Sequence, residues 1–299
     1  MPLWIPIAAA SYFLSGLAAI LDKFLISKRI PSAASYSFYV GILGIGVVVL
    51  APWGFAFLSF RLTIFALFSG AAFLAALYFF YGALKIDDAS RVVPLVGGTS
   101  PFFILLLSGI FFKQYLAGTE LLALLFFVAG GALLYLPKIA EEGGNFKFKS
   151  LLYGVLSAFF FALTFFLSKW VYGQSAFLAG FIWMRLGSFL AAVLMLALPK
   201  LRQDIWSTSR TTTKGSIYFF LINKVIGAGS FVLLNYALFL GPASIIDAMK
   251  GLEQVFVFII AVSFTKFYPE ILEESYTKKD IGGKLAGIAS FMIGFAILI

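Results

Sequence analysis

Long apolar runs recur along the whole chain, and short polar turns separate them. Ten such runs cover residues 3–26, 33–53, 62–84, 89–112, 118–137, 150–172, 176–198, 215–239, 243–266 and 281–299. Each is close to the roughly 20 apolar residues with which an α-helix crosses the hydrocarbon core of a bilayer. Barrel strands need only about 10 residues of alternating polarity, whereas these runs are continuously apolar. The sequence therefore predicts an all-α integral membrane protein with ten transmembrane helices.

The composition excludes several classes of chemistry. Of 299 residues, 62% are hydrophobic and 12% are charged, against roughly half and a quarter in soluble domains. The chain has no Cys and no His, so thiolate nucleophiles, disulfides, imidazole bases and the usual zinc ligands are excluded. We expect no enzyme activity, no metal and no cofactor. The net charge of +9 lies mostly in short loops, which predicts contact with membrane lipid rather than with nucleic acid.

The two halves of the chain are related by an internal repeat. At an offset of 146 residues, Lys169 falls on Lys23 and Gly187 falls on Gly41. At an offset of 154 residues, Ala237-Leu238 and Ala243-Ser244 fall on Ala83-Leu84 and Ala89-Ser90. The stretch 138–149 then reads as a linker between repeat 1–137 and repeat 150–299, and 199–214 reads as the other long loop. Two copies of five crossings insert in opposite orientations, so we expect inverted-topology repeats with a substrate path between them near the midplane.

Some of these runs carry family features. The fourth contains Ser100-Pro101-Phe102-Phe103 and then Leu105-Leu106-Leu107, and the ninth follows Gly241-Pro242-Ala243-Ser244. Together with five plus five helices, these residues resemble the drug/metabolite transporter superfamily, and more narrowly its EamA-type members. The resemblance implies export of metabolites or amino acids. The chain departs from the pattern at Lys113-Gln114, where many members have Gly-Glu, and at Val255, where the first half has Pro101.

The distribution of basic residues predicts an orientation. Loops after odd-numbered runs carry fifteen Lys and Arg residues, whereas loops after even-numbered runs carry two, Arg61 and Lys113. Basic loops stay on the cytoplasmic side of a membrane. The charge pattern therefore predicts a multi-pass protein of the inner or plasma membrane with both termini outside, whereas the family resemblance implies termini inside.

Four polar residues share one face of the ninth run, namely Asp247, Lys250, Glu253 and Gln254. Their spacings of three and four residues make them neighbours on a helix. A charged group inside a span costs on the order of 3 kcal/mol, so such groups face a partner or a water-filled cavity. The stripe predicts either the wall of a substrate cavity or a self-neutralising network of salt bridges.

Other runs add candidate substrate-binding residues. Arg185 lies about ten residues into its run, and a guanidinium in a cavity suits a carboxylate or a phosphate. Lys224 and Asn235 lie three helical turns apart and therefore share a face, for substrate hydrogen bonds or for helix packing. Tyr78 and Tyr81 are candidates for substrate contact or for ordinary packing.

Lys23 and Lys169 occupy equivalent places in the two halves. They are predicted to bind substrate or to extend their ammonium groups to the lipid headgroups. Asp22, beside Lys23, is expected to pair with another helix or to carry a proton. In the fourth run, Pro94, Gly97, Gly98 and Pro101 weaken the helical hydrogen-bond ladder and predict a hinge or free carbonyls facing a substrate.

The charged residues inside the runs have a surplus of positive charge. We therefore expect a secondary transporter for small organic anions or zwitterions such as amino acids, working by alternating access. Two alternatives remain: a lipid flippase or scramblase, and a membrane enzyme with Asp22 and Asp247 as its carboxylates. Gly283 and Gly287 form a small-xxx-small pair that indicates tight packing or a dimer face, so we expect a monomer or a homodimer.

Overall fold

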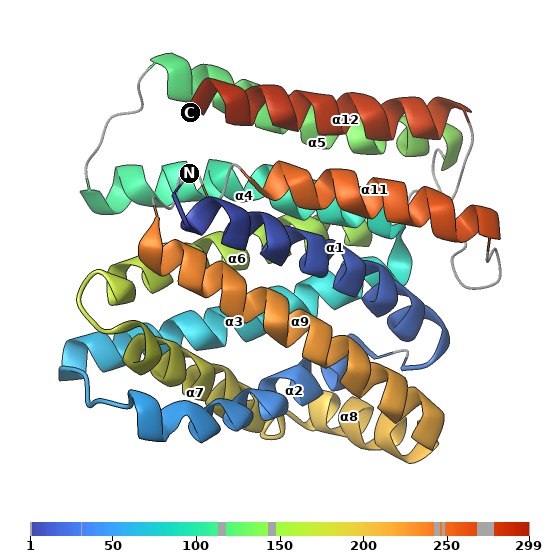
Figure 1. Cartoon of the computed structure of the whole chain (residues 1–299). Helices are drawn as coiled ribbons and strands as arrows, with labels where there is room; N and C mark the ends of the chain where they lie inside the picture. The colour runs from blue at the N-terminus through green and yellow to red at the C-terminus, as the bar shows by residue number, and fades with distance from the viewer. Residues whose placement is uncertain are drawn as a thin grey trace.

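The protein is a bundle of helices (Figure 1). The computed structural model describes residues 2–30, 32–112, 118–142, 148–241, 246, 249–267 and 278–298, and no strand occurs among them. The helices are α1 (Trp4–Lys28), α2 (Ala33–Leu43), the 3-10 helix η1 (Gly44–Trp53), α3 (Phe60–Ile86), α4 (Ala89–Phe112), α5 (Gly118–Glu142), α6 (Phe148–Tyr172), α7 (Phe177–Met195), α8 (Pro199–Thr211), α9 (Lys214–Leu240), α11 (Lys250–Phe267) and α12 (Lys278–Leu298).

Seven helical stretches of the described chain are long and apolar enough to cross a membrane. They are α1, α2 together with η1, α3, α4, α6, α7 and α9. Shorter apolar stretches run over Leu121–Leu133 in α5 and Ile281–Gly294 in α12. The prediction of an all-α, multi-pass membrane protein is thereby confirmed.

The prediction of a loop over 199–214 is wrong, because α8 occupies residues 199–211. This helix is amphipathic: Ile205 and Thr208 are buried, whereas Arg202 and Trp206 are exposed. Its apolar face is one or two side chains wide per turn. That is too narrow a stripe to stand out against the polar residues around it.

Three other boundaries differ from the predicted runs. The run 33–53 is an α-helix only as far as Leu43 and continues as η1, which contains Pro52. Helix α5 extends to Glu142, five residues past the predicted end at 137. Helix α11 begins at Lys250, and most of the predicted residues before it, Asp247 among them, lie outside the described residues.

Hydroxyl side chains fix the start of three helices. The side-chain oxygens of Ser32, Ser59 and Thr213 accept hydrogen bonds from backbone N–H groups in the first turns of α2, α3 and α9. Such caps satisfy N–H groups that have no partner within the helix. The caps matter here because an unsatisfied backbone group is costly near hydrocarbon.

Helices that are distant in sequence pack against each other. The most extensive contacts join α5 to α12, α3 to α6 and α7, and α1 to α9 (Figure 1). Small residues allow the closest approach: a Cβ atom at Gly70 of α3 would lie 1.9 Å from the carbonyl oxygen of Met184 in α7. Likewise, a Cβ atom at Gly130 of α5 would lie 3.0 Å from the carbonyl oxygen of Gly287 in α12. Gly287 therefore serves tight packing within the chain.

The bundle has two ends with different charge. The basic end is where α1 and α3 end and where α2, α4, α6 and α9 begin, with α8 beside it. The opposite end is where α1 and α3 begin and where η1 and α9 end; in Figure 1 it holds the N-terminus of the chain. Most Lys and Arg residues of the loops lie at the basic end.

Candidate functional site

A cavity of about 710 Å³ lies inside the bundle. Its lining comes from α1, α3, α4, α6, α7, α9 and α11, while the end of α2 and η1 form one wall. The volume lies within the range of roughly 300–1,000 Å³ that small-molecule sites have. The polar side chains in the lining are those of Tyr12, Ser15, Asp22, Tyr81, Ser100, Thr164, Ser168, Arg185, Lys224, Ser230, Asn235, Lys250 and Glu253.

The cavity collects about half of the residues singled out in the sequence. The predicted residues that line it are Gly97, Tyr81, Arg185, Lys224, Asn235, Lys250 and Glu253. The predicted residues that the structure places outside its lining are Lys23, Tyr78, Pro94, Gly98, Pro101, Lys169 and Gln254. Asp247 lies outside the described residues.

Arg185 presents a nearly buried guanidinium to the cavity. Its side chain is 9% exposed and lies over the rings of Phe73 and Phe231, with the guanidinium carbon 4.9 Å from each ring centroid. Gly44 leaves room for it, because a Cβ atom there would lie 2.9 Å from a terminal guanidinium nitrogen. No hydrogen-bond acceptor for this guanidinium is found among the described residues. Its N–H donors are therefore available to an anion.

Asp22 and Lys224 form an ion pair toward the basic end of the cavity. The Lys224 ammonium lies 2.7 Å from Asp22 Oδ1. The same oxygen accepts hydrogen bonds from the Tyr36 hydroxyl and the Asn223 amide, each at 2.5 Å. Such extra donors are what make a buried ion pair tolerable. The expectation that Asp22 pairs with another helix is met by this contact.

Aromatic rings surround the ammonium of Lys224. It lies 4.7, 5.3 and 5.5 Å from the ring centroids of Tyr36, Tyr81 and Phe220, and it donates to the Tyr81 hydroxyl at 3.2 Å. These rings attract a cation electrostatically. The arrangement holds Lys224 at one place between α9, α2 and α3.

Lys250 and Glu253 lie one turn apart at the start of α11. The Lys250 ammonium donates to Ser100 Oγ on α4 at 3.2 Å and lies 5.2 Å from the centroid of Phe165. Glu253 accepts a hydrogen bond from Ser15 on α1 at 2.6 Å. Lys250 and Glu253 of the predicted stripe thus line the cavity and reach two other helices through serine hydroxyls.

Two side-chain amides at the cavity differ in whether they have hydrogen-bond partners. Asn235 accepts from the Tyr172 hydroxyl at 2.9 Å and donates to the Phe231 carbonyl at 2.9 Å. Gln254 is 1% exposed, and its amide has no hydrogen-bond partner among the described residues. It faces Gly97, where a Cβ atom would lie 3.1 Å from the Gln254 nitrogen.

Lys23 and Lys169 bind backbone carbonyls at the ends of helices. Each ammonium group donates to two of them: Lys23 to Leu84 and Asp87 at 2.8 and 2.6 Å, and Lys169 to Leu238 and Gly241 at 2.9 and 2.8 Å. A cation is favourable there because the last carbonyls of a helix are unpaired and carry partial negative charge. Both lysines therefore cap helix ends, and neither of them lines the cavity.

The offsets of 146 and 154 residues, which relate the two halves of the sequence, also relate pairs of hydrogen bonds. Ser11 Oγ donates to the Ser230 carbonyl at 2.8 Å. Ser157 lies 146 residues after Ser11, Ala76 lies 154 residues before Ser230, and Ser157 Oγ donates to the Ala76 carbonyl at 3.0 Å. Asn223 donates to the Ala18 carbonyl at 3.4 Å, and Ser69 at the equivalent place donates to the Thr164 carbonyl at 3.2 Å. The contacts of α1 with α9 are thus repeated between α6 and α3.

The predicted hinge residues lie in an uninterrupted helix. Helix α4 contains both Pro94 and Pro101. Gly98 allows the ring of Phe291 on α12 to approach, since a Cβ atom there would lie 2.4 Å from it. Tyr78 packs beside the ring of Phe79, 5.3 Å away between centroids.

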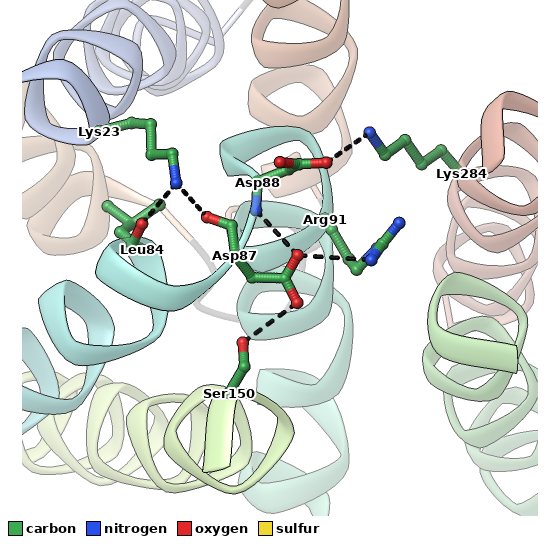
Figure 2. Close-up of polar contacts among 7 residues, drawn as sticks. All are labelled: Lys23, Leu84, Asp87, Asp88, Arg91, Ser150 and Lys284. Carbon is green, nitrogen blue, oxygen red and sulfur yellow. Dashed lines mark hydrogen bonds and ion pairs between the residues drawn. The ribbon is translucent and has the colours of Figure 1, made fainter. Parts of the chain in front are cut away.

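A second polar cluster lies at the basic end of the bundle (Figure 2). Asp87 Oδ1 lies 3.4 Å from Arg91 Nη1, and Asp87 Oδ2 accepts from Ser150 of α6 at 3.2 Å. Asp88 Oδ2 lies 3.2 Å from the ammonium of Lys284 on α12. The cluster therefore ties the start of α4 to helices of both halves of the chain.

The electrostatics of this cluster favour the ionised form of Asp88. Burial by itself would raise the pKa of Asp88. The positive charges of Lys284 and Arg91, together with the hydrogen bond from Lys284, outweigh that effect and lower the pKa below its ordinary value of 3.8. Opposite charges within hydrogen-bond distance act in this direction.

Sequence reasoning missed these residues for different reasons. Arg91 and Lys284 were counted as loop cations, although both are 1% exposed. The adjacent Asp87-Asp88 pair at the end of an apolar run was the available signal. The hydroxyls of Ser15 and Ser100 gave no signal, because Ser is common in helices of membrane proteins.

Comparisons with known proteins support a fold and no activity. No family model and no curated protein matches the chain. Several solved structures are similar to it, and one of them has a TM-score of 0.58 and 13% sequence identity over 98% of this chain and 95% of that chain. A likeness at this identity concerns the arrangement of the helices alone. The described residues contain no cluster of three or more Asp or Glu residues that could hold a metal ion.

Proposed function

We propose that this protein is a secondary transporter that carries small organic anions, zwitterionic amino acids included, through the cavity. The observation that carries the proposal is the guanidinium of Arg185, which lies in the cavity wall without an acceptor among the described residues. A buried cation is stabilised by a partner of opposite charge. A planar guanidinium binds a carboxylate or a phosphate through two parallel hydrogen bonds.

The other charges of the cavity balance one another. Asp22 pairs with Lys224, and Lys250 and Glu253 carry opposite charges one turn apart. Arg185 therefore supplies the net positive charge of the cavity. This balance favours a ligand with one anionic group and disfavours cationic drugs.

Two inverted five-helix repeats, covering 1–137 and 150–299, are the architecture that we propose. The hydrogen bonds that recur at offsets of 146 and 154 residues support it, since unrelated halves would not reproduce them. An odd number of crossings in each copy places the copies upside down relative to each other. The resemblance to EamA-type members of the drug/metabolite transporter superfamily points to the same arrangement.

Alternating access is supported by a difference between equivalent interfaces. Gly70 on α3 and Lys224 on α9 are equivalent at the offset of 154 residues. At Gly70, α7 packs directly on α3. At Lys224, the ammonium group and its aromatic rings occupy the space between α9 and α2. The two halves thus pack differently at equivalent places, which is compatible with alternating access.

We propose that the basic end is the closed side, because the cluster around Asp87 and Asp88 joins five helices there (Figure 2). We place this end in the cytoplasm, because basic loops remain there. The termini then lie outside, contrary to what the family resemblance implies. Labelling of a single cysteine introduced beside Arg202 tests this orientation, since the chain has no Cys of its own.

The test is binding and transport by Arg185 variants in liposomes. Arg185→Gln removes the charge and should lower the uptake of the transported anion at least tenfold, while Arg185→Lys keeps the charge and should retain part of it. Arg202→Gln is the matched control, because Arg202 is an exposed arginine of α8 outside the cavity. Uptake that Arg185→Gln leaves unchanged would exclude the proposed site. A screen of amino acids, organic acids and sugar phosphates by thermal shift supplies the anion.

A further inference from the structure

The wall of the cavity is incomplete between η1 and α9. Leu43 at the end of α2, Val49 in η1 and Val232 in α9 all line the cavity. The same residues are 44%, 70% and 38% exposed. Such exposure exceeds what residues facing only an enclosed cavity would have, which indicates that the cavity opens sideways at this place.

The helices on either side of the opening diverge from a common contact. Near the basic end, the rings of Tyr36 and Tyr39 on α2 lie 4.9 and 6.3 Å from the ring of Phe220 on α9. Farther along, η1 packs on α7 instead. Figure 1 shows the chain after α2 running along one edge of the bundle below α7, while α9 crosses toward the start of α1.

The opening faces hydrocarbon rather than water. Val49 belongs to the apolar stretch Ala33–Trp53, and Val232 lies within the span Lys214–Leu240, eight residues before its end. At a rise of about 1.5 Å per residue, Val232 lies roughly 12 Å inside the end of its helix. Leu, Val and Gly residues line the cavity along the opening. A molecule that uses this route must be soluble in the apolar part of the bilayer.

The wall at the opening has an unusual backbone. The 3-10 helix η1 is ten residues long, whereas most 3-10 helices extend over three or four residues because their hydrogen bonds are less favourable. It also contains Pro52, which donates no backbone hydrogen bond. This weaker segment is a wall that can adapt to a bulky apolar group.

A cation lies directly behind the opening. Gly44, the first residue of η1, leaves room for Arg185, whose guanidinium a Cβ atom at position 44 would approach to 2.9 Å. The rings of Phe73 and Phe231 lie beside it. A ligand entering between η1 and α9 therefore meets apolar side chains first and one positive charge at the end.

We infer that the ligand is an amphipathic monoanion, namely a carboxylate or phosphate with a hydrocarbon chain, which enters sideways from the bilayer. Its anionic group binds Arg185, and its chain lies in the opening between η1 and α9. This inference rests on the proposed function and narrows the substrate class. A lipid flippase or scramblase would use the same site, because the anionic group can belong to a free amphiphile or to a membrane lipid.

The test uses one head group with two chain lengths. Binding of radiolabelled butanoate and dodecanoate is measured in phosphatidylcholine nanodiscs, with protein-free nanodiscs subtracted. Val232→Trp fills the opening and should weaken dodecanoate binding at least tenfold while changing butanoate binding less than twofold. Val225→Trp is the matched control: Val225 lies on the same helix, is 73% exposed and does not line the cavity. It should change neither affinity.

Each outcome has a distinct meaning. If Val232→Trp affects both chain lengths equally, or neither of them, the sideways route is refuted while the anion site stands. If Arg185→Gln leaves both affinities unchanged, the proposed function itself fails. Dodecanoate with a photoreactive group on its last carbon should label η1 and α9; labelling confined to α5 and α12 would also refute the inference.

A competition experiment distinguishes a membrane lipid from a free single-chain amphiphile as the ligand. Phosphatidic acid added to the nanodiscs should displace dodecanoate if a lipid is the ligand, whereas dodecyl phosphate alone should displace it if the ligand has a single chain. Displacement by either supports the inferred class. Displacement by neither overturns it.

Discussion

Lys224 illustrates how a charged residue is accommodated in the middle of a membrane span. Its carboxylate partner is on α1, two of its aromatic neighbours are on α2 and α3, and Asn223 beside it donates to the same carboxylate. Each partner offsets part of the cost of removing an ammonium group from water. Lys224 therefore depends on three helices, α1, α2 and α3, that the sequence places far from it.

Removal of one member of this pair should destabilise the protein more than removal of both. Asp22→Asn or Lys224→Met leaves an uncompensated charge, which costs about 3–5 kcal/mol in buried pairs. The double variant should recover much of that loss. Thermal unfolding of the three variants in one detergent checks this as a double-mutant cycle. Additive effects would mean that the two groups do not interact.

Helices α3 and α7 pack as closely as they do because position 70 has no side chain. A Cβ atom at Gly70 would lie 1.9 Å from the carbonyl of Met184, while a Cβ atom at Gly229 on α9 would meet nothing nearer than 4.0 Å. Two glycines in long spans thus have opposite packing requirements. The difference follows from their neighbours rather than from glycine itself.

The Gly70→Ala variant should therefore lose about 1–3 kcal/mol of stability, since overpacking forces helices apart. Gly229→Ala should be neutral or gain up to about 1 kcal/mol from better helix propensity. Chemical denaturation of both variants in mixed micelles gives the comparison. Equal stabilities for the two would rule out a tight α3–α7 contact.

Helix α8 is attached to the bundle by few groups. Ile205 is 2% exposed, and Ser35 of α2 donates to the Asp204 carbonyl at 3.1 Å. Ile205→Asp should release α8 and speed tryptic cleavage after Arg202 and Arg210 several-fold, because a buried charge without a partner is costly. Ser207→Asp adds the same charge at an exposed position and should leave the cleavage rate unchanged.

At the scale of the whole molecule, ion pairs between described residues hold the basic end. Asp88 of the α3–α4 turn reaches Lys284 on α12, and Asp87 reaches Ser150 on α6 (Figure 2). In the second half, the equivalent positions are Gly241 and Pro242, which carry no charge. The two ends therefore differ in how acid affects them.

Acid should loosen the basic end. The folded pKa of Asp88 is lowered below its ordinary value of 3.8, so the folded state binds fewer protons than the unfolded state in that range. The resulting stability is fully present above that ordinary value and is lost as the pH falls through the lower, folded pKa. The melting temperature of the protein should fall at acidic pH, and that of Asp88→Asn should fall less. Equal falls in melting temperature for the protein and for Asp88→Asn at acidic pH would contradict this.

The sequence alone showed that this protein lies in lipid, and it located most of the helices. Runs of about 20 apolar residues leave only helices that satisfy their own backbone hydrogen bonds in lipid. The same runs made Arg185, Lys224, Lys250 and Glu253 conspicuous, because a charge in hydrocarbon requires a reason. These positions could be found without any knowledge of the packing.

Only the tertiary structure decided what each charge contacts. Lys23 and Arg185 look alike in the sequence, yet one binds the carbonyls at the end of α3 and the other faces a cavity. Helix α8 and the opening beside η1 were likewise invisible. The physical reason is that the hydrophobic pattern specifies the face and depth of a residue, whereas its partners come from other helices far along the chain, and no local pattern encodes them.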